Sequence, residues 1–263
     1  MIPELFKIGP LTINSFGVMA MLGFLIPTLL LRKEFSRFKY DPDLANGIII
    51  AAMIGGFVGA RIYFIAERWD GFLANPGDYL FTGAGLVWYG GLIGGILGVY
   101  LYVRSKKIGF PFIFDLVAPT IALGQTFGRV GCLLSGDGDY GPPTDLPWAM
   151  SFPQGIIPTN ELVHPTPIYD IIWLFGTFLF LWSIRKKELP AGFKMGLYLV
   201  LVGVGRILTE LFRTTPKILV GLSAAQLISV LFIAIGGIIL FNVTSKRKAK
   251  KSSGPILKDV QAS

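Results

Sequence analysis

The stretch Gly124–Gly141, GQTFGRVGCLLSGDGDYG, joins a long apolar segment to an acidic, glycine-rich loop. A single arginine, Arg129, lies inside the apolar part. A charged side chain in a membrane span costs roughly 2.5–3.5 kcal/mol on insertion scales, so such residues are rare and usually functional. Gly128 and Gly131 leave room beside Arg129 for another molecule to approach the backbone. The stretch therefore predicts a functional site near the end of a membrane helix.

The composition of the chain is typical of a membrane protein. Of its 263 residues, 52% are hydrophobic and 15% are charged, and the mean hydropathy is +0.62. These values are too apolar for an ordinary soluble globule. The net charge of +8 would suggest a nucleic-acid partner in a soluble protein. Here the basic residues lie in short clusters between apolar runs, so we expect them to set membrane orientation and expect no nucleic-acid partner.

We expect an all-α integral membrane fold with seven transmembrane helices. The apolar runs, each close to the length that spans a bilayer, are at approximately residues 11–31, 45–66, 84–103, 113–135, 167–184, 192–213 and 221–242. Residues 1–242 would form one domain, with a small external loop at about 136–166 and a basic, disordered cytoplasmic tail over 243–263. Within the loop, TDLPWAMSFP (144–153) is a candidate short hairpin.

The basic residues predict the orientation of the chain. The segments 32–39, 104–107, 185–194 and 246–258, which lie on one side of the predicted bundle, carry 17 of the 24 Lys and Arg residues, and the opposite side carries four. Because positively charged loops stay in the cytoplasm, we expect the N-terminus outside and the C-terminus inside. The N-terminal MIPELFKIGP lacks a basic region, so no cleavable signal peptide is expected.

Polar side chains gather at one depth of the predicted bundle. With an α-helical rise of about 1.5 Å per residue, Arg61, Arg129 and Arg206 lie within about 10 Å of the outer ends of three spans. The residues that open neighbouring spans at the same level are Tyr89, His164, Tyr169 and Asp170. A solvated face would not concentrate polar groups in this way. The sequence therefore predicts a site at the outer leaflet.

The sixth predicted span carries three charges on one face. Arg206, Glu210 and Arg213 are spaced by four and three residues, so they are neighbours on a helix. One interpretation is a salt bridge that serves only packing. In the other, Glu210 holds Arg206, whose planar fork suits bidentate contacts to phosphate. Arg129 and Arg206 would then clamp one phosphate, which indicates a phosphate-bearing lipid as ligand.

The sequence gives less support to a catalytic thiol, a catalytic histidine or a metal site. Cys132 is the single cysteine and lies in an apolar run, so an inert thiol is favoured over a nucleophile. The single histidine, His164, lies beside prolines and is more typical of a loop hydrogen bonder than of a catalyst. The spacing of His, Cys and acidic residues does not suit a metal, and nucleotide-binding and nucleophile motifs are missing from the sequence. We expect no metal and no organic cofactor.

Several motifs taken together resemble the prolipoprotein diacylglyceryl transferases. They are GRVG at 128–131 with the loop that ends at Tyr140–Gly141, GGLIG at 90–94, HPT at 164–166, and the segment 206–213. Their order and spacing match over approximately residues 10–242.

The resemblance implies a seven-span enzyme of the bacterial inner membrane with its active site towards the outer leaflet. Such an enzyme moves the diacylglyceryl group of phosphatidylglycerol onto the lipobox cysteine of a preprolipoprotein, and glycerol phosphate leaves. This is the first step of lipoprotein maturation. The implied partners are phosphatidylglycerol, the signal-peptide helix of the preprolipoprotein and membrane lipid.

The chain departs from the family pattern at several positions. Tyr89 stands where many members have histidine, Cys132 where many have asparagine, and Phe16 where well-known members have tyrosine. The loop from Ser135 is one residue longer than the shorter family form, with Asp137 or Asp139 where a glutamate is usual. These departures leave the general base open among Tyr89, Asp137 and His164, in descending order.

The predicted site follows from these arguments. The expected catalytic residues are Arg129, Arg206, Tyr89 and Asp137. The expected substrate-binding residues are Phe16, Arg61, Gly131, Cys132, Gly141, His164, Tyr169, Glu210 and Arg213. Two alternatives remain: a member of the family whose transferase activity is altered or lost, and a transporter or scramblase for a phosphorylated lipid or metabolite. Against the transporter, the polar groups lie at the outer level and the two halves of the chain show no repeat.

Overall fold

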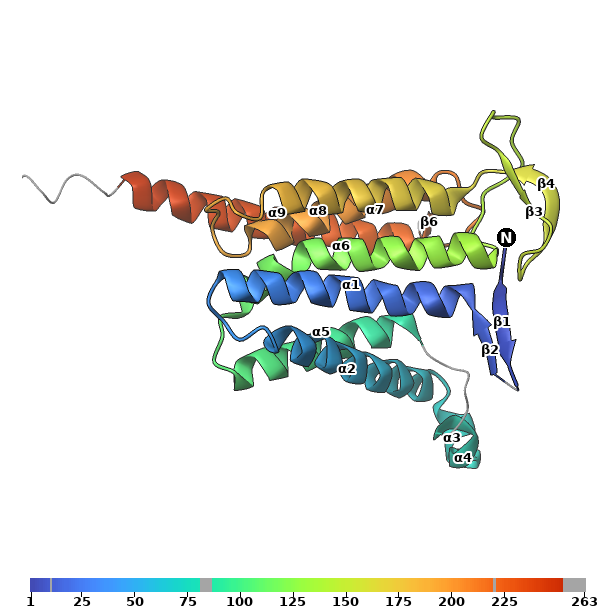
Figure 1. Cartoon of the computed structure of the whole chain (residues 1–263), viewed down its shortest axis with the longest axis horizontal. Helices are drawn as coiled ribbons and strands as arrows, with labels where there is room; N and C mark the ends of the chain where they lie inside the picture. The colour runs from blue at the N-terminus through green and yellow to red at the C-terminus, as the bar shows by residue number, and fades with distance from the viewer. Residues whose placement is uncertain (10, 81–86, 220, 253–263) are drawn as a thin grey trace, which may run out of the picture. The chain divides into compact units, whose positions relative to one another are not determined.

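The computed structural model describes residues 1–9, 11–80, 87–219 and 221–252, and this part of the chain is mostly helical. Its long helices, shown in Figure 1, are α1 (Ser15–Arg37), α2 (Leu44–Glu67), α5 (Trp88–Ser105), α6 (Phe110–Ser135), α7 (Thr166–Ser183), α8 (Phe193–Glu210) and α9 (Ala224–Ser252). Two short helices, α3 (Trp69–Ala74) and α4 (Pro76–Leu80), follow α2.

Five of the described helices are long and apolar enough to cross a membrane: α1, α2, α6, α7 and the Ala224–Lys246 part of α9. Helix α8 falls outside this group because its 18 residues include Lys194, Arg206 and Glu210. Glycines and tyrosines lower the hydropathy of α5. Of the predicted all-α fold with seven spans, the coarser part is confirmed: the described chain is mostly helical and has several helices that can cross a membrane. The count of seven spans stays a prediction. Residues 84–86 of the third predicted span lie outside the described residues.

The first predicted span begins too early. Strands β1 (Glu4–Ile8) and β2 (Leu11–Asn14) pair in antiparallel fashion, and α1 begins only at Ser15. Gly9 has a φ of +59°, a conformation that glycine adopts without strain, and it lies in the connection between the two strands. The apolar and polar residues of β2 alternate, which suits a strand better than a helix.

The external loop contains a hairpin, but not the predicted one. Strand β3 (Met150–Phe152) pairs with β4 (Thr159–Val163), so only one half of the stretch 144–153 forms a strand. Pro147 and Pro153 cannot donate hydrogen bonds to a ladder, which prevents both strands from forming within those ten residues. A third antiparallel pair, β5 (Lys217–Leu219) and β6 (Leu222–Ser223), precedes α9. The fold is therefore mostly helical rather than all-α.

Helix α9 extends past the predicted end of the last span. It continues to Ser252, so residues 243–252 are helical where a disordered tail is predicted. Residues 253–263 of that tail lie outside the described residues. The division into a domain and a tail stays a prediction.

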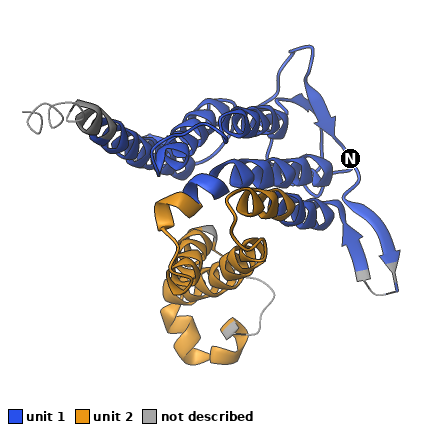
Figure 2. Ribbon diagram, turned by 60° about the vertical axis from the view of Figure 1, so that its left-hand side comes forward, with its two compact units in different colours: residues 1–27, 114–263 blue, residues 28–113 orange. Residues whose placement is uncertain are grey.

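The chain divides into two compact units: unit 1 comprises residues 1–27 and 114–263, and unit 2 comprises residues 28–113 (Figure 2). In unit 2, α2 packs closely on α5 through glycines. A Cβ atom on Gly94 would lie 2.8 Å from the Cα atom of Gly59, and a Cβ atom on Gly98 would overlap the carbonyl oxygen of Ala51. Small residues spaced by four let two membrane helices approach this closely.

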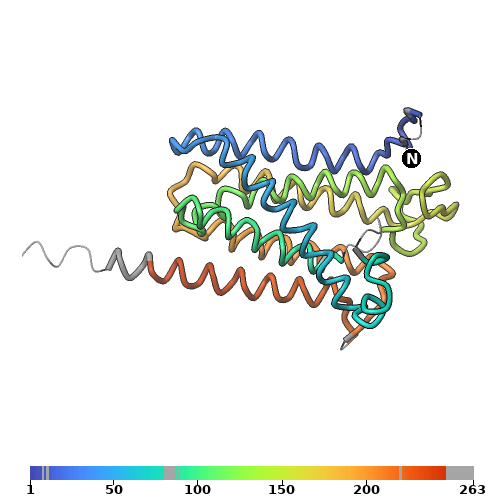
Figure 3. The backbone as a smooth tube through the Cα atoms, turned by 90° about the horizontal axis from the view of Figure 1, so that it is seen from below, coloured from blue at the N-terminus to red at the C-terminus, as the bar shows by residue number. Residues whose placement is uncertain are grey.

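In unit 1, buried polar contacts fix α8 against its neighbours. The amides of Gly192 and Met195 each donate to the carboxylate of Asp115 on α6 at 2.9 Å, which satisfies free N–H groups at the start of α8. The indole of Trp173 on α7 donates to the carbonyl of Leu201 at 2.8 Å. Figures 1 and 3 both show α6, α7 and α8 side by side. Several of the predicted site residues lie near the ends of these three helices.

Candidate active site

Six charged side chains form one cluster in unit 1. They come from α6, the external loop, α7, α8 and the residues just after α8, and they are Arg129, Asp139, Asp170, Arg206, Glu210 and Arg213. Three of them are guanidinium groups and three are carboxylates. The cluster is therefore formally neutral.

Asp170 is the centre of the cluster. Its Oδ2 atom lies 3.1 Å from Nε of Arg129, 3.5 Å from Nη1 of Arg206 and 2.8 Å from Nη2 of Arg213. The side chain is only 7% exposed. One carboxylate on the first turns of α7 thus holds guanidinium groups from two other helices and from the chain beyond α8.

Asp139, which is on the external loop, bridges two of the same arginines. It forms ion pairs with Arg129 and with both terminal nitrogens of Arg213, the second of these at 2.8 Å. Its side chain is 25% exposed, more than that of Asp170. The loop that carries it contains Gly136 and Gly138, whose φ angles are +59° and +91°. Such angles favour glycine, so the sequence GDGD sets the path of this loop.

The predicted pair of Arg206 and Glu210 is present in the structure. Nη2 of Arg206 lies 3.2 Å from Oε2 of Glu210, and the hydroxyl of Ser223 donates to Oε1 of Glu210 at 2.8 Å. Glu210 is 2% exposed, so its position is set by packing as well as by these contacts. Arg213 does not share this pair and contacts the two aspartates instead.

The three arginines differ in their access to solvent. Arg129 and Arg206 are 26% and 24% exposed, whereas Arg213 is 6% exposed. Arg129 and Arg206 are therefore the more accessible of the three side chains. Arg213 is placed to hold the aspartates.

His164 and Tyr169 form an aromatic group beside the cluster. Nδ1 of His164 lies 3.1 Å from the Tyr169 hydroxyl, and the Trp148 indole donates to the same hydroxyl at 2.8 Å. The amide of Gly141 donates to the carbonyl of His164 at 2.9 Å. A Cβ atom on Gly141 would lie 2.8 Å from Cβ of His164 and would overlap the carbonyl of Phe212. Gly141 thus allows the loop, His164 and the chain beyond α8 to meet.

Tyr140 anchors the loop from its other side. Its ring stacks on Phe152 with centroids 4.1 Å apart, and its hydroxyl lies 2.8 Å from the carbonyl of Gly136. Burial raises the pKa of Tyr140 above its ordinary value, so its hydroxyl keeps its proton. The backbone around Asp139 is further held by Thr166, whose hydroxyl donates to the Asp139 carbonyl at 2.5 Å.

The glycines near Arg129 have two different environments. A Cβ atom on Gly131 would lie 3.0 Å from Cδ2 of Phe16, so this glycine lets α1 pack on α6. A Cβ atom on Gly128 would have no described heavy atom within 4 Å beyond its own helix and chain neighbours. Cys132 lies on the next turn, with Sγ 4.0 Å from Nη1 of Arg129. Open space therefore remains at Gly128, one residue before Arg129.

Asp137 does not join the ion cluster within the described residues. Its Oδ1 atom accepts a hydrogen bond from the amide of Asp139 at 3.3 Å, and its carboxylate lies beside the Cys132 thiol. It is thus close to the cluster without being held by an arginine there.

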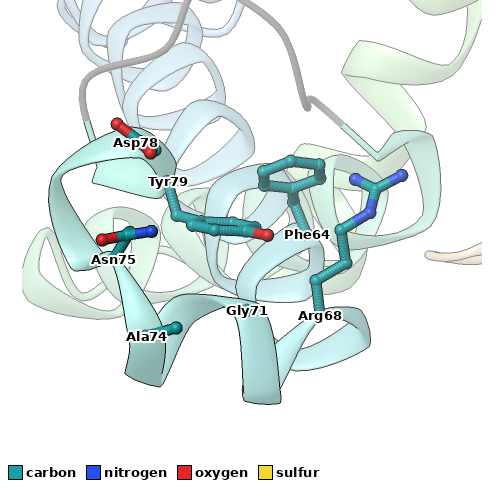
Figure 4. A pocket seen from close by; sticks show the side chains of 7 residues that line it. All are labelled: Phe64, Arg68, Gly71, Ala74, Asn75, Asp78 and Tyr79. Atoms are coloured by element: carbon teal, nitrogen blue, oxygen red, sulfur yellow. The ribbon is translucent and has the colours of Figure 1, made fainter.

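Two predicted site residues belong to unit 2. The ring of Tyr89 lies 6.3 Å from that of Tyr63, and the guanidinium of Arg61 lies 5.9 Å from the ring centroid of Phe64. Unit 2 also contains a cavity of about 400 Å³, lined in part by Arg68 and Tyr79 (Figure 4). None of the predicted site residues is among the described residues that line it. The placement of Arg61 and Tyr89 in the site stays a prediction.

Comparison with known proteins identifies the family. The profile of the family described as prolipoprotein diacylglyceryl transferase matches residues 3–242. The chain belongs to this family. Among its relatives are a phosphatidylglycerol–prolipoprotein diacylglyceryl transferase of Clostridium tetani, 39% identical over 249 residues that cover 94% of this chain and 99% of the relative, and one of Clostridioides difficile, 35% identical over 94% and 97%. One of Synechococcus elongatus is 32% identical over 89% and 84%.

Three of the arginines that sequence analysis selected, Arg129, Arg206 and Arg213, are neighbours in the structure. Arg61 belongs to unit 2, and the two aspartates that join the other three arginines were missed. Asp170 and Asp139 are absent from the predicted set of site residues. Asp170 directly follows Tyr169 at the predicted depth, and a carboxylate in a membrane helix itself indicates a functional site.

In the described residues no group of three or more His, Cys, Asp and Glu side chains is arranged to hold a metal ion.

Proposed function

We propose that this protein is a phosphatidylglycerol–prolipoprotein diacylglyceryl transferase. It transfers the diacylglyceryl group of phosphatidylglycerol to the thiol of the lipobox cysteine in a preprolipoprotein. The names of its relatives support the donor and the acceptor. The observation that carries the proposal is the meeting of Arg129 and Arg206 at one buried carboxylate, Asp170.

Arg129 and Arg206 bind the phosphate of the donor. They extend from α6 and α8, are partly exposed, and present planar N–H forks that match phosphate oxygens. Glu210 orients Arg206, and the 3.2 Å contact between their side chains supports this role. The further residues of the proposed substrate site are Phe16, Arg61, Gly131, Cys132, Gly141, His164, Tyr169 and Arg213.

The reaction forms one bond and breaks one at the glyceryl carbon, after a proton transfer from the thiol. A base takes the proton of the acceptor thiol, and the sulfur attacks the glyceryl carbon that carries the phosphate ester. A thioether forms as the carbon–oxygen bond breaks, and the electron pair goes to the phosphate oxygen of the departing glycerol phosphate. Fixed cations in a water-poor site stabilise the charge that develops there. Tyr89, Asp137 and His164 are the candidate bases, in that order.

The site faces the outer leaflet of the bacterial inner membrane. In this arrangement residues 1–242 form one seven-span domain with its N-terminus outside, and the basic segment from 243 lies in the cytoplasm. The uneven distribution of Lys and Arg supports this orientation. The acceptor enters as a membrane helix through an opening between spans, and the acyl chains of the donor lie against apolar walls.

The test is a transfer assay with purified protein in nanodiscs. Phosphatidylglycerol labelled in its acyl chains is supplied with a peptide that carries a lipobox cysteine, and with a matched peptide in which serine replaces that cysteine. We expect label only on the cysteine peptide, with stoichiometric release of glycerol phosphate. Movement of labelled lipid between leaflets without transfer to either peptide would favour a scramblase and overturn the proposal.

A further inference from the structure

We propose that the Asp139 carboxylate competes with the donor phosphate for Arg129, and that donor binding turns this side chain out of the cluster. This inference rests on the proposed function and adds a residue that sets how tightly the site holds phosphate.

The cluster carries no net charge while Asp139 is part of it. Three guanidinium groups face three carboxylates, so the six side chains offer no net attraction to an anion. Removing one carboxylate leaves one positive charge. That charge matches the single negative charge of a phosphodiester such as phosphatidylglycerol.

Of the three carboxylates, that of Asp139 is the one that can turn out of the cluster. Asp170 and Glu210 are on helices and almost completely buried, whereas Asp139 is on the external loop and a quarter exposed. Its departure leaves no buried arginine unpaired, because Arg213 and Arg129 keep Asp170 at 2.8 Å and 3.1 Å. An unpaired buried charge is what makes the loss of the other two carboxylates costly.

The movement is a rotation of the side chain. The Asp139 backbone is held through the Thr166 hydroxyl, and the neighbouring Tyr140 is held by its stack on Phe152. The loop therefore stays in place while the carboxylate turns towards solvent.

The Asp139 carboxylate and the donor phosphate accept hydrogen bonds from the same N–H groups of Arg129. The carboxylate of Asp139 accepts from Nη1 of Arg129, as an oxygen of a phosphate bound there would. The same competition acts after transfer, because glycerol phosphate must leave the arginines. Return of Asp139 to Arg129 then favours release of the product.

The test compares neutral and acidic residues at this position. Asp139→Asn keeps the size of the side chain and removes its charge. We expect the KM for phosphatidylglycerol and the inhibition constant for added glycerol phosphate both to fall about tenfold, which corresponds to the loss of the competing charge-assisted contact at Arg129. Asp139→Glu restores the carboxylate and returns both constants towards wild type. Asp145→Asn removes a charge from an exposed position in the same external loop and leaves both constants unchanged.

A purely structural role for Asp139 gives the opposite result. If it only holds the arginines in place, Asp139→Asn raises the KM and weakens inhibition, and either change overturns the proposal. Asp139→Ser removes the carboxylate with a smaller side chain and provides the same comparison if the Asn variant does not fold. Binding of glycerol phosphate, measured by the shift in melting temperature, needs no turnover. It separates failure of this inference from failure of the proposed function, which would show as no transfer by the wild type.

Discussion

The Oδ2 atom of Asp170 lies 3.1 Å from the Nε atom of Arg129, which joins a carboxylate on α7 to a guanidinium on α6. Both residues lie near the ends of candidate membrane spans. Charges in a low-dielectric environment interact strongly and are costly when unpaired, so this contact fixes where the two helices can meet. Arg206 and Arg213 contact the same oxygen, which makes the four residues one unit.

Replacing Asp170 should therefore affect stability as well as activity. Asp170→Asn leaves Arg213, which is almost completely buried, with Asp139 as its remaining acidic partner. Breaking a buried ion pair by removing one partner costs about 3–5 kcal/mol. We expect a clearly lower melting temperature in detergent together with loss of transfer. Glu161→Gln, at an exposed carboxylate in the external loop, is the control, and equal melting of both variants would contradict the role assigned to Asp170.

Cys132 should be dispensable. Its Sγ atom makes only weak polar contacts, at 4.0 Å from Nη1 of Arg129 and beside the Asp137 carboxylate. When the thiol is removed, Arg129 keeps its ion pairs with Asp139 and Asp170. We expect Cys132→Ala and Cys132→Asn to retain most of the transfer rate, measured in nanodiscs with equal amounts of folded protein. Complete loss in Cys132→Ala with normal membrane insertion would instead make the thiol catalytic.

The two glycines Gly128 and Gly141 should respond differently to alanine. Gly141→Ala places a methyl group against His164 and Phe212, so we expect a lower melting temperature.

The added methyl group of Gly128→Ala meets no described atom within 4 Å beyond its own helix and chain neighbours, and alanine is favoured over glycine in a helix by about 1 kcal/mol. We expect unchanged or higher stability but about tenfold slower transfer if the substrate occupies this open space, because the methyl group would then misplace it. A normal rate in Gly128→Ala would show that no substrate uses this space.

Local features of the structure could be predicted from the sequence. Arg206 and Glu210 pair because residues four apart on a helix are neighbours, and Gly55, Gly59, Gly94 and Gly98 pack because their spacing clears one face of each helix. Both features follow from the period of the α-helix alone.

Contacts between distant segments could not be predicted in this way. Depth along the membrane normal placed Arg129 and Asp170 at one level, but it did not give the rotation of α6 and α7 that brings them together. The β1–β2 hairpin was missed because a four-residue alternating pattern beside an apolar run is easily included in a helix. The partner of β3 was missed because strands pair across a loop whose path depends on turns and on Tyr140.

The orientation of the chain can be tested with reporters. The excess of Lys and Arg in alternate connections predicts that a reporter fused after Lys250 is cytoplasmic and that one inserted near Asp145 is external. Fusions at both positions, scored by a pair of reporters that are each active on only one side of the membrane, measure this directly. Exchanged signals would place the arginine cluster at the inner leaflet and contradict the proposed location of the site.

The arginine clamp gives the sharpest prediction for catalysis. Arg129→Ala and Arg206→Ala each remove a preorganised donor to the leaving phosphate, which typically costs about 2.7–4 kcal/mol, or roughly a hundred- to thousandfold in rate. Arg129→Lys and Arg206→Lys keep the charge but lose the planar fork, so both should remain well below wild type. Glu210→Gln should be milder than Arg206→Ala, because the arginine stays and Ser223 still contacts the side chain at position 210. Transfer to a lipobox peptide, with folding checked by thermal melting, measures all five variants. Near-normal turnover in both alanine variants would mean that these arginines serve packing alone.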